Sequence, residues 1–381
     1  MTVFRPTIRR SRFLISAPAV LVLALLAAAP AAAEERALEQ TFDAAAVTAV
    51  ELENLAGEVT LVAAAGSTGR IAGTVHAEAS AGETGAALVE ALQVRFDREG
   101  GKLVARADYP TDRHRRYHYP ARSSDRDGED SWLVSWLGGS GSSVTYQKRQ
   151  VRVSSSASSD AATLWADFRI EVPAGVAVTV RNSVGRIGST GVAADQSLDT
   201  ASGDIESTGG RGALSADTGS GDVQVVDHEG GVVADTGSGD VSFERVRGEK
   251  LAADTGSGDV HLLDCAGALM ADTGSGDIRG RGLTLGRQAH ADTGSGDIRL
   301  EGDFSAVRDL RIDTGSGNVV LDVTAAPSVH LVVSTGSGDI DVDLPDMKVR
   351  QVKGEFVADI SGGEGKGVID TGSGDVTIAS R

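Results

Sequence analysis

The chain has 381 residues, of which 36 are basic and 54 are acidic, and it contains one cysteine, Cys265. An acidic excess of this size repels nucleic acid and anionic lipid, so we expect neither as a partner. A lone cysteine excludes an internal disulfide, so the fold must depend on its core or on repetition.

The first 33 residues have the order of a secretory signal peptide. Four arginines precede the uncharged apolar run Phe13–Leu26, and three alanines then lead up to Ala33. That run is shorter than the ~20 residues that a membrane-spanning helix needs, so we predict cleavage after Ala33. The mature chain would carry 32 basic and 54 acidic side chains, a net charge of −22. We expect a periplasmic or secreted protein of a Gram-negative-type envelope, with no transmembrane segment in the mature chain.

Residues 34–106 are predicted to form an N-terminal β region. The stretch VELENLAGEVTLVAA (residues 50–64) reads as strand, glycine and strand. Ala86–Leu92 is predicted to be a short helix, and LQVRF and KLVARA to be strands. Residues 107–162 break this pattern because they are rich in Arg, Asp, Ser and Gly. We predict a flexible polar insertion there, which could be deleted without unfolding the rest.

Two groups in the insertion are candidates for binding a partner. The sequence RHRRYHY (residues 113–119) mixes basic and aromatic side chains, which could hold phosphate or an anionic glycan. The alternative is a solvated loop, since acidic residues nearby offset the charge. A Trp-rich knot, Trp132–Leu137, could cover a solenoid face or contact a partner. The candidate residues are Arg113, Arg115, Arg116, Tyr117, Tyr119, Trp132 and Trp136.

Residues 163–381 are dominated by a repeat. The phrase DTGSGD, or a close variant, begins at Asp199, Asp217, Asp235, Asp254, Asp272, Asp292, Asp313, Ser334 and Asp370, with a worn copy at Asn182. The last step is 36 residues, close to two periods, which predicts one degenerate rung near residues 341–365. Residues 164–180 are predicted to be the first strands of this region, and the final TIASR its last.

Alternation on both sides of Gly-Ser-Gly predicts a strand, a tight turn and a second strand in each repeat. Leu214, Ala216 and Thr218 share one side before the turn, and Val223 and Val225 share one side after it. Only stacked copies can bury these apolar sides. We therefore predict an all-β fold, a parallel β-helix or β-solenoid with about ten short rungs of 18–21 residues and two strands per rung. The inward threonines are expected to bond the turn backbone or the next Thr.

Together, VELENLAGEVTLVAA, FRIEVPAGVAVTVRNSVGRI and the repeated T(G/A)SGD(V/I) resemble the bacterial DUF4097 family, whose label is that of an adhesin. The resemblance covers most of residues 45–378, with the insertion outside it. It implies a β-solenoid in the cell envelope and no established reaction.

Stacking would align the motif aspartates in two rows. The first contains Asp199, Asp217, Asp235, Asp254, Asp272 and Asp292, with Asp313 behind. Carboxylates ~5 Å apart repel one another unless something compensates. We expect each Asp to accept hydrogen bonds from turn amides first. The alternative is Ca²⁺ bound between rungs, for which the candidate ladder is Asp204, Asp222, Asp240, Asp259, Asp277 and Asp297.

We expect no enzyme. The DTG of aspartic proteases needs two facing carboxylates that share a proton, whereas stacked repeats place theirs in rows. The expected function is an exported, non-catalytic scaffold for binding or structure in the envelope, with an envelope protein or a glycan as partner. Ca²⁺ is the only cofactor that the sequence suggests. The alternatives are a polysaccharide-active β-helix enzyme and a calcium-stabilised adhesive repeat protein.

Overall fold

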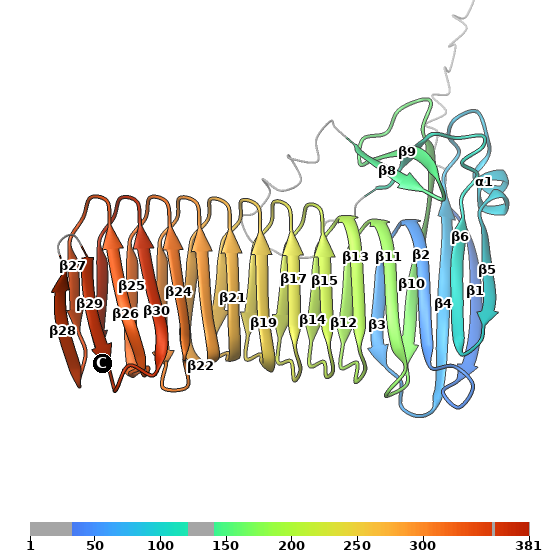
Figure 1. Cartoon of the computed structure of the whole chain (residues 1–381). Coiled ribbons are helices and arrows are strands. Elements are labelled where there is room, and N and C mark those ends of the chain that lie inside the picture. Colours follow the sequence, from blue (N-terminus) through green and yellow to red (C-terminus); the bar gives the residue numbers. More distant parts are fainter. Residues whose placement is uncertain (1–32, 121–140, 353–354, 381) are drawn as a thin grey trace, which may run out of the picture. The chain divides into compact units, whose positions relative to one another are not determined.

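The computed structural model describes residues 33–120, 141–352 and 355–380, and Ala33–Arg381 form one compact unit (Figure 1). The predicted signal peptide lies outside the described residues except for Ala33. Within the described ranges, the one helix is α1 (Gly85–Ala91), which is far too short to span a membrane. The rest of the regular structure is β.

The strands form a stack of coils, each of which contributes one strand to each of two faces (Figure 1). Face 1 runs in spatial order through β2 (Ala49–Ala56), β11 (Ala177–Val184), β13 (Gln196–Ser202), β15 (Leu214–Thr218), β17 (Val232–Thr236), β19 (Arg247–Thr255), β21 (Ala266–Thr273), the second half of β22 (Ile278–Thr293), β24 (Asp309–Thr314), β30 (Gly365–Thr371) and β26 (Val329–Thr335). Face 2 runs through β3 (Val59–Ala63), β12 (Ile187–Thr190), β14 (Ile205–Thr208), β16 (Val223–Val226), β18 (Val241–Glu244), β20 (Val260–Leu263), the first half of β22, β23 (Ile298–Asp303), β25 (Val319–Ala325), β31 (Val376–Ser380) and β27 (Ile340–Asp343).

All of these neighbours pair in parallel, and the repeat keeps one register through the stack. Asp217 pairs with Asp235 and Asp235 with Asp254, so each motif lies on the next. The alternating valines point inward: Val223 and Val241 are completely buried. The predicted β-solenoid with two strands per coil is confirmed.

The threonine of each motif faces inward, and its hydroxyl bonds the turn backbone as predicted. Thr255 is 1% exposed, and its Oγ1 donates to the carbonyl of Gly239 in the preceding coil at 2.7 Å. The same oxygen accepts from the N–H of Gly258 in its own turn at 3.1 Å. Equivalent donations to the preceding turn are made by Thr200, Thr218, Thr236, Thr273, Thr293, Thr314, Thr335 and Thr371. A buried hydroxyl is thereby satisfied without a side-chain partner.

The second glycine of each turn is required by the close approach of the preceding coil. A Cβ on Gly258 would lie 1.9 Å from the carbonyl oxygen of Gly239, and a Cβ on Gly276 would lie 1.9 Å from that of Gly258. Such contacts are far inside van der Waals distance, so no residue with a side chain fits without separating the coils.

The N-terminal end of the stack is closed by antiparallel strands on both faces. On face 1, β6 (Lys102–Asp108) pairs in parallel with β2, and β5 (Gln93–Glu99) pairs antiparallel with β6. On face 2, β10 (Ala162–Val172) follows β3, and β4 (Thr68–Ala77) and β1 (Glu34–Asp43) continue antiparallel. The predicted strand–glycine–strand segment 50–64 is thus a true coil. The helix and strands predicted between residues 86 and 107 are also present.

The insertion differs from its prediction, because its two described ends are folded onto this end of the stack. They form the small strands β7 (Arg116–His118), β8 (Ser142–Tyr146) and β9 (Arg149–Ser154), with β7 paired to β9 and β10. Tyr109, Tyr117 and Tyr146 are buried and meet edge to face. The Tyr109 hydroxyl donates to the Asn54 side chain and to the Ala56 carbonyl of the first coil. We therefore no longer expect residues 107–162 to be dispensable for folding. Because the stretch is polar overall, its composition did not indicate that three of its tyrosines complete the core.

The C-terminal coils are stacked out of chain order. β30 and β31 occupy the position after β24 and β25, and β26 and β27 lie beyond them. The predicted degenerate rung near 341–365 is wrong. This stretch forms the antiparallel strands β28 (Met347–Val352) and β29 (Glu355–Ile360), which extend face 1 beyond β26. The 36-residue step therefore contains a hairpin and a backward insertion, not two coils.

The close approach of the turns predicts a large effect of one methyl group. Gly258→Ala is expected to lower the free energy of unfolding by more than about 3 kcal/mol, because its Cβ collides with the neighbouring backbone. The matched control is Gly188→Ala in β12, where an added Cβ meets nothing within 4 Å, and it should change stability by less than about 1 kcal/mol. Urea unfolding of both variants checks this, and equal stabilities would contradict it.

Candidate binding surface

The residues that follow Gly-Ser-Gly form one row along the stack, here called the cap row: Asp204, Asp222, Asp240, Asp259, Asp277, Asp297, Asn318, Asp375 and Asp339. Each of these side chains except that of Asp339, in the last coil, accepts a hydrogen bond from the backbone N–H of its counterpart in the next coil. Asp240 Oδ1, for example, accepts from the N–H of Asp259 at 2.8 Å. The acceptor role predicted for these aspartates is confirmed, but the amide belongs to the next coil and not to the same turn.

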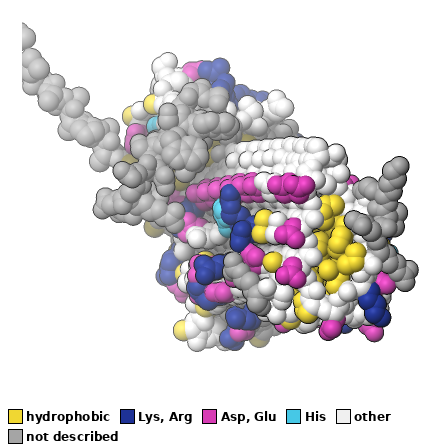
Figure 2. All heavy atoms as spheres, turned by 90° about the vertical axis from the view of Figure 1, so that its left-hand side faces the viewer, with side chains coloured by type: hydrophobic (Ala, Val, Ile, Leu, Met, Phe, Trp, Pro, Cys, Tyr) yellow, Lys and Arg dark blue, Asp and Glu magenta, His cyan; other side chains and the backbone are white. Residues whose placement is uncertain are grey.

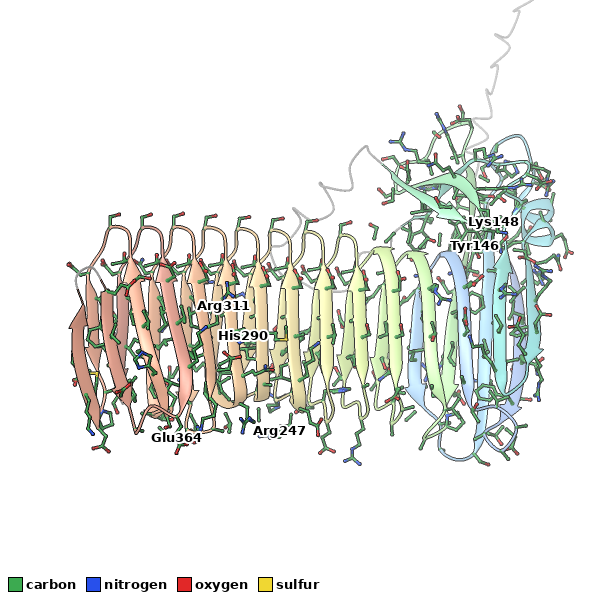
Figure 3. All side chains as sticks on the ribbon, viewed as in Figure 1. Tyr146, Lys148, Arg247, His290, Arg311 and Glu364 are labelled. Atoms are coloured by element: carbon green, nitrogen blue, oxygen red, sulfur yellow. The ribbon has the colours of Figure 1, made fainter. Side chains whose placement is uncertain are left out.

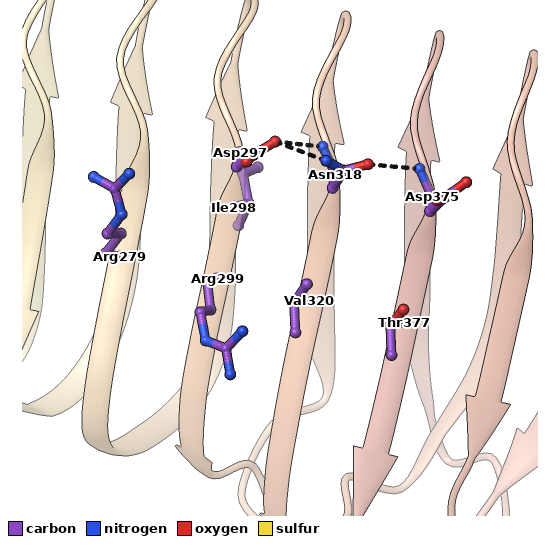
Figure 4. A pocket seen from close by; sticks show the side chains of 8 residues that line it. All are labelled: Arg279, Asp297, Ile298, Arg299, Asn318, Val320, Asp375 and Thr377. Carbon is purple, nitrogen blue, oxygen red and sulfur yellow. Dashed lines mark hydrogen bonds between the residues drawn. The ribbon is translucent and has the colours of Figure 1, made fainter.

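Asn318 shows that the cap needs an oxygen and not a charge. Its Oδ1 accepts from the N–H of Asp375 at 3.0 Å, and its Nδ2 donates to Asp297 Oδ1 at 3.2 Å (Figure 4). Two carboxylates of the row, those of Asp259 and Asp277, are partly neutralised by an arginine on face 2. Arg279 donates to Asp259 Oδ2 at 3.1 Å and also contacts Asp277.

Arg279 and Arg299 line a shallow depression of ≈350 Å³ beside the cap row (Figure 4). Both follow the motif at the outward position of the alternation, in IRG and IRL. Neither arginine was expected to have a role, although the alternation places both at outward positions next to the aspartates. Arg299 is paired with Asp322, so both guanidinium groups already have acidic partners.

A metal site receives no support from this arrangement. Among the residues that the structure describes, no group of three or more His, Cys, Asp or Glu side chains is placed to hold a metal ion. In the cap row, one oxygen of each carboxylate from Asp204 to Asp297 is occupied by a backbone amide. The Ca²⁺ ladder of Asp204, Asp222, Asp240, Asp259, Asp277 and Asp297 stays a prediction.

The aspartates that begin the motif form a second row on the outer side of face 1, here called the open row: Asp199, Asp217, Asp235, Asp254, Asp272, Asp292, Asp313 and Asp370. All are exposed except the half-buried Asp313. Within the described chain, the side chains from Asp199 to Asp292 make no hydrogen bond or ion pair. This row is therefore a line of uncompensated like charges at the ~4.8 Å spacing of the strands.

Partial burial and repulsion together alter the proton affinity of four aspartates in the row. Partial burial, together with the charges of adjacent aspartates, raises the pKa of Asp217, Asp254 and Asp272 above the usual 3.8. The pKa of Asp313 is raised in the same way, although Arg311 opposes the shift. A raised pKa means that the folded chain binds the proton more tightly than the unfolded chain, so the ionised row costs stability.

A shallow groove runs beside the open row across β11 to β19. Small or uncharged side chains line much of it, including Thr179, Ser197, Ser215 and Val233. Farther along, His290 and Arg311 occupy the same outward position in adjacent coils (Figure 3). The open row, the groove and these two basic residues make up the most regular outer surface of face 1.

The candidate partner-binding residues of the insertion do not form one surface. Arg113, Arg115 and Arg116 are exposed, and Arg113 is paired with Glu83 and Arg116 with Asp160. Tyr117 is completely buried among aromatic rings and cannot contact a partner, so its assignment is corrected. Burial raises its pKa well above the usual value. Tyr119 is half-buried near Trp165, whereas Trp132 and Trp136 lie outside the described residues.

Residues 214–379 match the model of a protein family described as Toastrack DUF4097. The resemblance to DUF4097 is thus confirmed for this part of the chain. No curated protein matches the sequence. Among solved structures, a candidate cell adhesion protein from Clostridium sporogenes ATCC 15579 matches 91% of this chain and 100% of its own, with 8% identity and a TM-score of 0.19. A likeness this low carries no argument about function.

The cap row predicts different outcomes for two substitutions at one position. Asp240→Ala removes the acceptor of the Asp259 amide and is expected to cost about 0.5–2 kcal/mol of unfolding free energy. Asp240→Asn keeps an oxygen, as Asn318 does, and should be nearly neutral. Thermal melting with and without a calcium chelator checks both. If chelator lowers the melting temperature of the wild type but not of Asp240→Ala, the row is a metal ladder and not a set of caps.

The open row predicts a stability that depends on pH. Asp254→Asn removes one charge from the middle of the row and should raise the melting temperature at pH 7. The corresponding gain in the free energy of unfolding is expected to be less than about 1 kcal/mol. The cost of the ionised row is absent below the usual pKa of 3.8 and appears as pH rises through the raised folded-state value. The gain should therefore vanish in acid. Glu99→Gln, remote from the row, is the control, and a gain independent of pH would contradict the explanation.

Proposed function

We propose that this chain, in which residues 214–379 match Toastrack DUF4097, is an exported, non-catalytic scaffold that presents the open row of face 1 to an envelope protein or a glycan. The observation that carries the proposal is the open row itself. The carboxylates from Asp199 to Asp292 make no hydrogen bond or ion pair within the described chain. The pKa values of Asp217, Asp254 and Asp272 are raised, which means that ionising these three side chains costs stability. Charges that destabilise a fold and face outward are typical of binding sites.

The backbone beneath the row favours binding of an extended partner. The coils that carry the repeat are fixed to one another by ladder bonds, threonine hydroxyls and the cap row. A surface that is already ordered loses little conformational freedom on binding. Regular spacing also lets a polymer or a flat protein surface engage several carboxylates at once, which raises the apparent affinity.

The proposal favours a scaffold over a polysaccharide-active enzyme because of how the coils connect. Sites of that kind lie in clefts with walls made by long loops. In the described coils that carry DTGSGD, the turn beside the open row consists of Gly-Ser-Gly, and the groove next to it is shallow. This surface suits contact with a partner better than enclosure of a scissile bond.

Export is part of the same proposal. Its support is the order of basic, apolar and small residues before Glu34 and the acidic character of the chain that follows. A periplasmic or secreted location would place the open row where an envelope glycan or protein can reach it.

The test compares two variants that remove the same charge. The triple variant Asp217→Asn, Asp235→Asn, Asp254→Asn neutralises the centre of the open row. The control, Glu78→Gln, Glu90→Gln, Glu99→Gln, changes three exposed acids near the N-terminal end of the stack. Binding of the chain from Glu34 onward is measured on a glycan array and by capture from solubilised envelope, with uronate release assayed alongside. We expect the open-row variant to bind at least about tenfold more weakly and the control to bind like the wild type.

Two results would overturn the proposal. Equal binding by the open-row variant and the control would show that face 1 is not the binding surface. Uronate release by the wild type would show that the chain is an enzyme. Melting curves of both variants establish that they fold.

A further inference from the structure

The two faces end at different strands at the C-terminal end of the stack. Face 2 stops at β27, whereas face 1 continues beyond β26 through β29 and β28. Neighbouring strands lie ~4.8 Å apart, so face 1 overhangs face 2 by two strands, or roughly 10 Å. This end is therefore a step, unlike the N-terminal end, where antiparallel strands extend both faces.

The inner side of the overhang is mostly apolar. The pairing of β29 with β26 and of β28 with β29 places six positions on the side that faces the core: Met347, Val349, Phe356, Ala358 and Ile360, together with Gln351. No strand of face 2 lies opposite the outermost of these among the described residues. Val349 is 51% exposed as a result, and Met347 and Phe356 are only half-buried.

The last coil is uncovered in the same place. Ile340 and Val342 of β27 are half-buried, although their neighbours Val376 and Ile378 in β31 are buried. Figure 2 looks onto this end and shows hydrophobic side chains gathered in one patch beside acidic ones. A core that ends in an exposed valine and half-buried Ile, Val and Phe side chains is typical of a surface that another chain covers.

The two free strand edges at this end carry opposite charge. Among the described strands, β27 pairs only with β31, and β28 pairs only with β29. β27 has the sequence IDVD and follows Asp339, and Asp341 and Asp343 are exposed. β28 has the sequence MKVRQV, with two basic residues and no acid, and Lys348 is exposed. Charges on an edge strand prevent pairing with most other strands, but these two edges complement each other.

We propose that a second copy of this chain covers the step, so that β27 of each copy pairs with β28 of the other. A twofold axis parallel to the strands exchanges face 1 with face 2. The overhanging β29 and β28 of one copy then fill the recess beyond β27 of the second, and the reverse holds on the opposite side. Contacts of this kind are the isologous, closed type found in most homodimers.

Strand direction and charge both select this arrangement. β28 is antiparallel to β29, which is antiparallel to β26, so β28 runs in the direction of β26 and opposite to β27. The twofold axis leaves these directions unchanged, so β28 meets the second copy's β27 as an antiparallel neighbour. The other end-to-end twofold axis, perpendicular to the faces, would place β28 on β28 and β27 on β27. That arrangement would bring like charges next to each other and would leave a gap on face 2.

The first experiment measures oligomeric state. Sedimentation of the chain from Glu34 onward, over a wide concentration range, is expected to show a monomer–dimer equilibrium. Val349→Asp should raise the dimer dissociation constant at least about a hundredfold, because it would bury an unpaired carboxylate in an apolar contact. The matched control is Leu263→Asp on the outer side of β20, where the leucine is 40% exposed, and it should dimerise like the wild type.

The second experiment tests the geometry. Lys348→Cys and Asp341→Cys are made separately, and Cys265 is buried, so it should not react. With a short bismaleimide, a mixture of the two variants should form a crosslinked dimer, whereas neither variant should crosslink alone. The reason is that the two copies of residue 348 lie on opposite faces of the dimer.

The outcomes separate the alternatives. Crosslinking of Lys348→Cys alone would show that β28 of one copy lies next to β28 of the other, and it would overturn the proposed pairing. A wild type that stays monomeric, a Val349→Asp variant that dimerises normally, or growth into filaments also overturns it. The loss of dimer in Val349→Asp with normal melting, together with crosslinking only in the mixture, supports it.

Discussion

The close approach of successive Gly-Ser-Gly turns is the constraint on which the rest of the stack depends. The carbonyl of Gly239 lies where a Cβ of Gly258 would be, so the turns touch backbone to backbone. That contact lets the threonine hydroxyl reach the preceding turn and the Asp carboxylate reach the following amide. The glycine, threonine and second aspartate of the motif are therefore parts of one packing arrangement repeated along the chain.

The two aspartates of the motif have opposite energetic roles although they lie five residues apart. The second accepts an amide hydrogen bond between coils, and Asn318 fills the same role without a charge. The first has no partner from Asp199 to Asp292 and carries a raised pKa at several positions. Packing therefore explains the second aspartate but not the first. The proposal that face 1 binds a partner begins from that difference.

Periodicity predicted the coils well because each repeat makes the same local contacts. It could not predict the order of the last coils, since the DTGSGD at Asp370 has the same sequence whether it lies before or after the coil at Ser334. The fold of the insertion could not be predicted from its sequence, for a different reason. Tyr109, Tyr117 and Tyr146 lie singly in polar sequence, and only the fold brings their rings together. The Asp rows were predictable in position, but the partner of each carboxylate depended on stacking geometry.

The backward insertion of β30 and β31 accounts for the unequal ends of the stack. Because the final coil enters between β24 and β26, the chain uses residues 344–364 to travel back, and it lays β28 and β29 along face 1 on the way. Among the described strands, none extends face 2 beyond β27. The step, its exposed valine and its two oppositely charged edges thus arise together from one feature of the topology. In the proposed dimer, β29 and β28 of the second copy lie beyond β27 of the first copy and so extend its face 2.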